Sequence, residues 1–217
     1  MRSSIRRRLT LLAVALCAGL LQAVPAASLP TGAFEYRIDR DGSPIGKQRL
    51  TVTQHGDKTT VSIDVKVQVK VAFVTVYRYE QARSETWQGD RLMALDTRTN
   101  DNGDKLFLKG HVNGSDFAIE TEKGPTTAPL GLVPASYWNI ATVDQKRLLD
   151  VEDGRVLNIT VTGGTNEPVD LGSRQTQARY FQIAGDVDKE LWYDPSGVLL
   201  KIRFKARDGS LIEFVLR

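Results

Sequence analysis

The chain has 217 residues with 29 basic and 26 acidic side chains, which gives a formal charge of +3. Residues 1–27 carry four of the arginines and no acid, so the remainder has 25 basic and 26 acidic side chains and a formal charge of −1. Nucleic-acid binding depends on clustered positive charge that neutralises phosphates, so we exclude that class of partner. The one cysteine, Cys17, lies in the same segment, and the remainder can form no disulfide, thiolate nucleophile or cysteine-ligated metal site.

The N-terminal segment has the pattern of an export signal. Four arginines precede an apolar run over residues 9–21, and small residues follow it. Cleavage is expected after Ala26 or Ala27, although a retained anchor is the alternative. The apolar run is shorter than the about 20 residues that a membrane span requires. We therefore predict a signal peptide over residues 1–27, a periplasmic protein without a stable transmembrane segment, and a single β-rich domain over residues 28–217.

Alternating side chains predict a protein made of β-strands. In VSIDVKVQVKV, residues 61–71, every odd position is Val or Ile and every even position is polar, which is typical of a strand with one buried face. Similar segments are separated by Asp-Gly, Asn-Gly and Pro sequences that favour tight turns. The expected strands are 34–40, 45–54, 61–71, 74–87, 91–99, 105–112, 116–120, 155–162, 176–185, 190–193, 198–206 and 211–217. This spacing predicts an all-β fold, a single antiparallel and strongly curved sheet or open barrel of about eleven or twelve strands.

The segment APLGLVPASYWN, residues 128–139, interrupts this series of hairpins. Pro129 and Pro134 exclude it from the centre of a sheet. Ser136 is expected to cap a short helix over YWNIATV, with Tyr137 and Trp138 turned inward. Because these aromatic side chains combine a large apolar body with a polar group, we predict a plug that closes one opening of the curved sheet.

The strand over residues 74–87 carries charged side chains in an unusual place. Arg78 and Glu80 follow Val74 and Val76 on a face that looks apolar. One interpretation is that the strand extends past the core, so that this end is solvated or forms an ion pair at a rim. The other is that Arg78 lies inside a concave sheet and can bind an anionic group.

The sequence contains little that indicates catalysis. The nucleophile motif G-x-S-x-G is missing, and His55 and His111 lie beside glycine-rich turns without the spacing of a zinc site. TNDNGD, residues 99–104, lacks the bidentate glutamate of a calcium loop. We therefore predict no metal and no cofactor. The alternative is a carboxylate-dependent hydrolase of envelope glycan or lipid, which would pair two of three acids: Glu80, Glu85 and Asp96.

Three segments carry distinctive aromatic motifs. They are VKVAFVTVYRYEQARSETWQGDRLMALDTRTNDNG, APLGLVPASYWN and LWYDPSGVLLKIRFKARDGSLIEFVL. Together they resemble a family of bacterial exported proteins of unknown function, which implies an envelope location and no established activity. More distantly, the architecture is similar to curved-sheet periplasmic proteins that carry lipids or lipoproteins. The candidate ligand-binding residues in these motifs are Tyr77, Arg78, Tyr79, Glu80, Trp87, Tyr137, Trp138, Asn139 and Trp192.

We expect a non-catalytic binding module for a hydrophobic or amphipathic ligand, such as an acyl chain, or for an envelope protein. In this hypothesis Arg78 orients the anionic head of the ligand. A domain that binds a partner through exposed strand edges is the remaining possibility.

Overall fold

The computed structural model describes residues 30–217, which form fifteen strands and one 3-10 helix, η1. The predicted signal peptide and its cleavage sites lie outside these described residues. The first eight strands are β1 (Gly32–Arg40), β2 (Ser43–His55), β3 (Lys58–Val71), β4 (Val74–Gln88), β5 (Arg91–Asp101), β6 (Asp104–Asn113), β7 (Asp116–Thr121) and β8 (Gly124–Pro129). The other elements are β9 (Val133–Pro134), η1 (Ile140–Asp144), β10 (Arg147–Leu149), β11 (Val156–Asp170), β12 (Gln175–Gly185), β13 (Lys189–Tyr193), β14 (Leu199–Lys205) and β15 (Leu211–Leu216).

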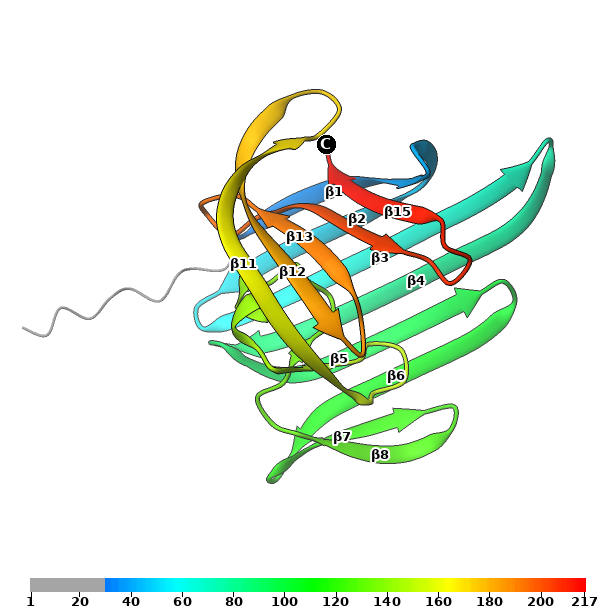
Figure 1. Cartoon of the computed structure of the whole chain (residues 1–217). Helices are drawn as coiled ribbons and strands as arrows, with labels where there is room; N and C mark the ends of the chain where they lie inside the picture. Colours follow the sequence, from blue (N-terminus) through cyan, green and yellow to red (C-terminus); the bar gives the residue numbers. More distant parts are fainter. Residues whose placement is uncertain (1–29) are drawn as a thin grey trace, which may run out of the picture.

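All fifteen strands belong to one sheet, in the order β8-β7-β6-β5-β4-β3-β2-β1-β15-β14-β13-β12-β11-β10-β9. Neighbouring strands are antiparallel except β9 and β10, which are parallel. The chain therefore starts in the middle of the sheet, builds outward to β8, crosses to the opposite edge at β9 and returns to pair β15 with β1 (Figure 1).

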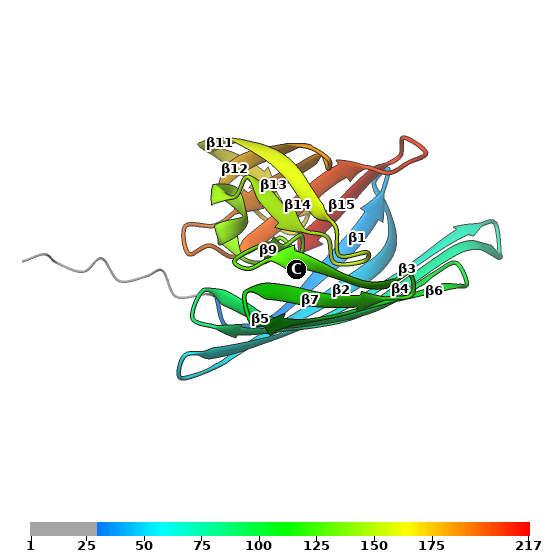
Figure 2. The same cartoon turned by 90° about the horizontal axis from the view of Figure 1, so that it is seen from below.

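The sheet curls so that its two edges approach each other without pairing. Pro129 ends β8 and Val133 begins β9, so the edges lie within the reach of four residues, about 14 Å. Figure 2 shows the half formed by β11–β15 lying over the half formed by β2–β7. The main hydrophobic core fills the space between the two halves.

A second, smaller apolar cluster lies on the outer face of β13–β15. Gly163 and Gly164 have φ values of 113° and 92°, and the register with β12 shifts at this point. A Cβ atom on Gly163 would lie 2.5 Å from the carbonyl oxygen of Tyr180, so this bulge requires glycine. The bend lets the far ends of β11 and β12 cover Trp192, whose indole N–H donates to Glu167 at 2.6 Å.

The predicted fold class is confirmed, and the structure contains three strands that the sequence pattern did not indicate. These are β8, β9 and β10, which flank the plug and are too short or too rich in proline to show alternation. The predicted helix begins later than expected, because Asn139 rather than Ser136 is its N-cap. Among residues 30–217, no helix has the length and apolarity that crossing a bilayer would need.

Candidate functional site

The candidate site is built on the inward-facing side chains of β4, which we call the inner row: Tyr79, Gln81, Arg83, Glu85 and Trp87. In antiparallel strands, directly opposed residues share a face of the sheet. The register with β3 therefore places the middle of the inner row beside the apolar face of that strand, through the pairs Val65–Gln81, Ile63–Arg83 and Val61–Glu85. A row of polar side chains consequently lies in the interior of the curled sheet.

A β-bulge near the turn between β3 and β4 decides which side chains face inward. Val71 pairs with Val74 beside the turn, whereas Val67 pairs with Tyr79 beyond the bulge. Without the bulge Val67 would oppose Arg78, because a slip of one residue exchanges the two faces of a strand. The interpretation that Arg78 faces a concave interior is therefore wrong: Arg78 is exposed on the outer face.

Glu85 is the most deeply buried member of the inner row, with no exposed surface. Its Oε2 atom accepts hydrogen bonds from the indole N–H groups of Trp87, at 3.0 Å, and Trp138, at 2.8 Å. The two indole rings meet edge to face, with centroids 6.1 Å apart. The other oxygen, Oε1, is buried and has no hydrogen-bond partner among the described residues. Glu85 thus fixes Trp138 of the plug against β4 and keeps one acceptor unused.

Arg83 is buried with most of its hydrogen-bonding capacity unsatisfied. Its Nη2 atom donates to the side-chain oxygen of Gln81. Nε and Nη1 are buried and find no acceptor within residues 30–217. Buried polar atoms are nearly always paired with protein or water, so this guanidinium can donate hydrogen bonds to a further anionic or carbonyl-bearing group.

The far end of the inner row is held by Glu152, from the loop between β10 and β11. The Tyr79 hydroxyl donates to Glu152 Oε1 at 2.6 Å, and burial together with the Glu152 charge raises the pKa of Tyr79. The Gln81 side-chain N–H group lies 2.7 Å from the Tyr79 hydroxyl and 3.1 Å from Thr99 Oγ1. The side chains of Tyr79, Gln81, Thr99 and Glu152 thus form a polar network, which Gln81 connects to Arg83.

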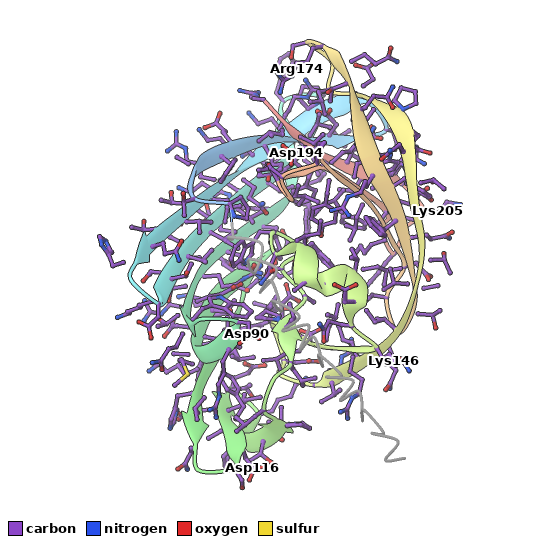
Figure 3. All side chains as sticks on the ribbon, turned by 90° about the vertical axis from the view of Figure 1, so that its left-hand side faces the viewer. Asp90, Asp116, Lys146, Arg174, Asp194 and Lys205 are labelled. Atoms are coloured by element: carbon purple, nitrogen blue, oxygen red, sulfur yellow. The ribbon has the colours of Figure 1, made fainter. Side chains whose placement is uncertain are left out.

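The segment between β8 and β10 closes the end of the interior that faces the viewer in Figure 3, where its light green ribbon crosses between the two halves of the sheet. Trp138 is 1% exposed and Tyr137 9%, as expected for the predicted plug. Tyr137 has a φ of 60°, a conformation that is strained for a bulky residue. Its carbonyl oxygen accepts a hydrogen bond from the buried Tyr193 hydroxyl at 2.7 Å. Asn139 Oδ1 accepts from the Ala141 N–H at 2.9 Å and caps η1.

A second cation faces the interior from the opposite half of the sheet. Lys189, at the start of β13, lies with Nζ 3.2 Å from the ring centroid of Phe204. Burial lowers its pKa to about 8, opposed by the charges of Asp188 and Glu152. Arg83 and Lys189 therefore place positive charge near the network of Tyr79, Gln81 and Glu152 from opposite halves of the sheet.

The structure brings together only part of the predicted site. Tyr79 and Trp87 belong to the inner row, and Trp138 contacts it through Glu85 and Trp87. Tyr137 and Asn139 are buried in the plug segment, whereas Trp192 belongs to the second cluster.

Arg78 and Glu80 instead line a hollow of about 620 Å³ on the outer face, which Lys66 and Arg217 also border. Tyr77 is half-buried where β4 leaves the sheet, and burial raises its pKa.

The sequence did not indicate three residues of the site, Gln81, Arg83 and Glu152, and it indicated Glu85 only as a possible hydrolase carboxylate. Gln81, Arg83 and Glu85 share the alternating face that begins with Tyr79 and ends with Trp87. Those two aromatic side chains were the signal that this face is the buried one. Glu152 lies in a loop, and no pattern in its neighbourhood indicates its position.

The carboxylates proposed for a hydrolase do not form a catalytic pair. Glu85 faces inward, whereas Glu80 and Asp96 are on the outer face. Glu80 pairs with Asn100, four residues along β5 from Asp96, a separation of about 13 Å along the strand. This exceeds the about 5–9.5 Å that glycosidase carboxylates require, so the hydrolase alternative is not supported.

Comparison with known proteins places the fold and leaves the activity open. The family model described as "Domain of unknown function (DUF6134)" matches residues 36–217. No curated protein matches the chain at a significant level. A solved structure, the β-barrel-like protein of domain of unknown function DUF1849 from Brucella abortus, is similar with a TM-score of 0.59 and 14% sequence identity. The match covers 85% of this chain and 94% of that one, and at this identity it concerns the fold alone.

Proposed function

Because the chain belongs to the DUF6134 family of domains of unknown function, its role must be inferred from its own residues, and we propose a non-catalytic binding module. Its ligand is an amphipathic molecule with an anionic head, such as a carboxylate or a phosphate, and an apolar chain. The proposal includes export by segment 1–27 and action in the periplasm.

The observation that carries the proposal is the unsatisfied guanidinium of Arg83. Two of its nitrogen atoms are buried without an acceptor in the described part of the chain. An arginine in this state is costly unless a partner pairs with it, because burial removes the hydration of its charge. An anionic head at this position would form charge-assisted hydrogen bonds, which are about twice as strong as neutral ones.

The apolar part of the ligand would pack against partly exposed side chains at the edge of the main core. Val67, Phe204, Ile212 and Phe214 are partly exposed side chains packed against the main core. Each methylene that moves from water onto such a surface contributes about 0.8 kcal/mol. Tyr137 and Trp138 close one end of the interior. Because the backbone of Tyr137 is strained, movement of this segment on ligand entry would release that strain.

Binding of a partner through a strand edge is less well supported. The edge strand β8 contains Pro125 and Pro129, and the other edge, β9, has two residues, one of them Pro134. Proline and short length are the devices by which edge strands avoid pairing with other chains.

The proposal can be tested by thermal unfolding in the presence of dodecanoate or dodecyl phosphate below their micellar concentrations, with dodecanol as the uncharged control. At a ligand concentration of about 100 times Kd, binding stabilises a protein by about 2.7 kcal/mol. For a domain of this size that corresponds to an increase in Tm of about 5–10 °C. Mass spectrometry of lipids extracted from protein purified from the envelope identifies the natural ligand.

Arg83→Met separates a binding role from a structural one. If Arg83 is kept for a ligand, the variant loses the response to both anions and, with no buried charge to desolvate, the empty protein is as stable as the parent or more stable. Arg98→Met, on the exposed face of β5, is the matched control and keeps the response. If the ligand-free Arg83→Met protein loses about 3–5 kcal/mol of unfolding free energy, a structural ion pair has been broken and the proposal is overturned. It is also overturned if neither anion changes the Tm of the parent.

A further inference from the structure

The tip of the β3–β4 hairpin extends beyond the rest of the sheet. Pairing of β2 with β3 ends at Gly46 and Val67, and pairing of β5 with β4 ends at Tyr79 and Asp101. Residues 68–78, which we call the outer ribbon, therefore have only each other as strand partners, and Figure 1 shows the hairpin extending past its neighbours. At the base of the ribbon the Arg78 carbonyl oxygen also accepts a hydrogen bond from the Asn102 N–H at 2.7 Å. A two-stranded ribbon without neighbours is marginally stable in water. Fold stability therefore does not explain why the hairpin extends this far.

The outer ribbon has one apolar and one polar face. Register places Val69 opposite Tyr77 and Val71 opposite Val74 on the face that continues from the core. The other face carries the hydrogen bond from Gln68 to Thr75, at 2.7 Å, together with charged side chains. The exposed large hydrophobic side chains of residues 30–217 all lie here, with exposed fractions of 63% for Val71, 99% for Phe73, 66% for Val74 and 50% for Val76.

The charge of this region is uniformly positive along the chain. Lys66, Lys70 and Arg78 lie between Asp64 and Glu80, and no acidic residue separates them. Glu35 and Glu80 border the same hollow as Lys66 and Arg78 at the base of the ribbon, and further acidic side chains lie in the neighbouring turns.

Of those turn acids, Asp208 pairs with Arg40 at 2.6 Å and Asp41 accepts a hydrogen bond from the Leu211 N–H at 2.9 Å. Asp101 and Asp104 flank the turn between β5 and β6, and burial together with Asp101 raises the pKa of Tyr77 in the ribbon.

Exposed apolar side chains beside basic ones match the surface of an anionic bilayer, which offers acyl chains next to phosphates. A protein partner fits less well, because a stable interface buries about 800 Å² on each side. The exposed large hydrophobic side chains of the outer ribbon are one phenylalanine, which can bury about 150–250 Å², and three valines.

We propose that the outer ribbon docks the protein on anionic membranes, with Phe73 and its flanking valines inserted below the lipid headgroups and Lys70 and Arg78 in contact with lipid phosphates. This inference does not depend on the interior ligand site, since Arg83 lies outside the ribbon. Membrane binding and ligand binding can therefore be tested by separate measurements.

Vesicle co-sedimentation tests the proposal, with residues 28–217 as the protein because they hold all fifteen strands. Vesicles of phosphatidylcholine mixed with phosphatidylglycerol are compared with phosphatidylcholine alone. We expect binding to the anionic vesicles that weakens with salt. Phe73→Ser should weaken it about tenfold, a change of about 1.4 kcal/mol, and Lys70→Ser about fivefold, since each basic residue near an anionic surface contributes about 1 kcal/mol. Lys58→Ser, at the other end of β3, is the matched control and should bind as the parent does.

Phe73→Trp provides a readout independent of sedimentation. The native tryptophans Trp87, Trp138 and Trp192 are at most 4% exposed, so an indole at position 73 dominates the fluorescence that a soluble quencher can reach. Anionic vesicles should shift its emission to the blue and protect it from quenching. The proposal is overturned if this indole remains quenchable, if Phe73→Ser binds vesicles like the parent, or if Phe73→Ser instead converts a dimer to a monomer without vesicles.

Discussion

Replacement of Glu85 by alanine should remove the link between β4 and the plug. In the structure one carboxylate oxygen accepts both indole N–H groups, at 3.0 Å from Trp87 and 2.8 Å from Trp138. Each buried donor left without an acceptor costs about 1–3 kcal/mol, so Glu85→Ala should lower the free energy of unfolding by about 4 kcal/mol. Glu85→Gln keeps one acceptor oxygen and should cost about 1 kcal/mol.

Urea unfolding followed by tryptophan fluorescence measures this change, because both indoles are buried in the core. The midpoint should fall while the m-value stays constant, which identifies a change in stability rather than in compactness. Glu80 is on the same strand with its side chain in solvent, so Glu80→Ala should change the free energy of unfolding by less than about 0.5 kcal/mol. If Glu85→Ala and Glu80→Ala lose similar amounts, the carboxylate does not hold the plug.

Three further substitutions probe other parts of the fold. Lys189 has its pKa lowered to about 8 by burial, so the unfolded chain binds the proton more tightly and stability should rise between about pH 8 and 10.5, by about 3 kcal/mol in total. Lys189→Met should remove this rise and stabilise the protein at pH 7, and denaturant titrations across this pH range would show a persisting rise if another group is responsible. Tyr193→Phe removes the buried hydrogen bond to the Tyr137 carbonyl and should cost about 1–2 kcal/mol in urea unfolding; a smaller loss would mean that water replaces the hydroxyl. Gly46→Ala would place Cβ 2.2 Å from the Lys66 carbonyl oxygen, and a fall in Tm equivalent to about 2 kcal/mol or more is expected, whereas an unchanged Tm would mean that β2 can shift.

The fold class followed from the sequence because alternation over residues 61–71 and the glycine turns act locally. Twelve strands were visible in this way, and each corresponds to a strand of the structure. The three short strands β8, β9 and β10 are held by position in the sheet rather than by their own pattern. The helix start was misplaced because Tyr137 adopts a positive φ, which a tertiary hydrogen bond from Tyr193 stabilises and which no local propensity predicts.

The site was predicted in part, and the misplacement of Arg78 has one cause. The inward orientation expected for Tyr137 and Trp138 is found, since both are buried, and Trp138 meets Trp87 edge to face. The charged partner was assigned to the wrong face because a single extra residue near the β3–β4 turn reverses the alternation. Such a bulge leaves no signal in composition. The register of β4 against β3 shows that Arg83 lies on the buried face, which in the sequence only Tyr79 and Trp87 indicated.

The pairing of β1 with β15 has a consequence for how the protein is made. Tyr36 and Leu216 are register partners, so the centre of the sheet joins the first and the last strand of residues 30–217. Contacts between distant residues slow folding, and the last strand must arrive before the middle of the sheet is complete. A chain that stops short of β15 would leave β1 and β14 as long unprotected edges, which are templates for aggregation. Truncated copies of this protein should therefore accumulate as insoluble material rather than as smaller folded units.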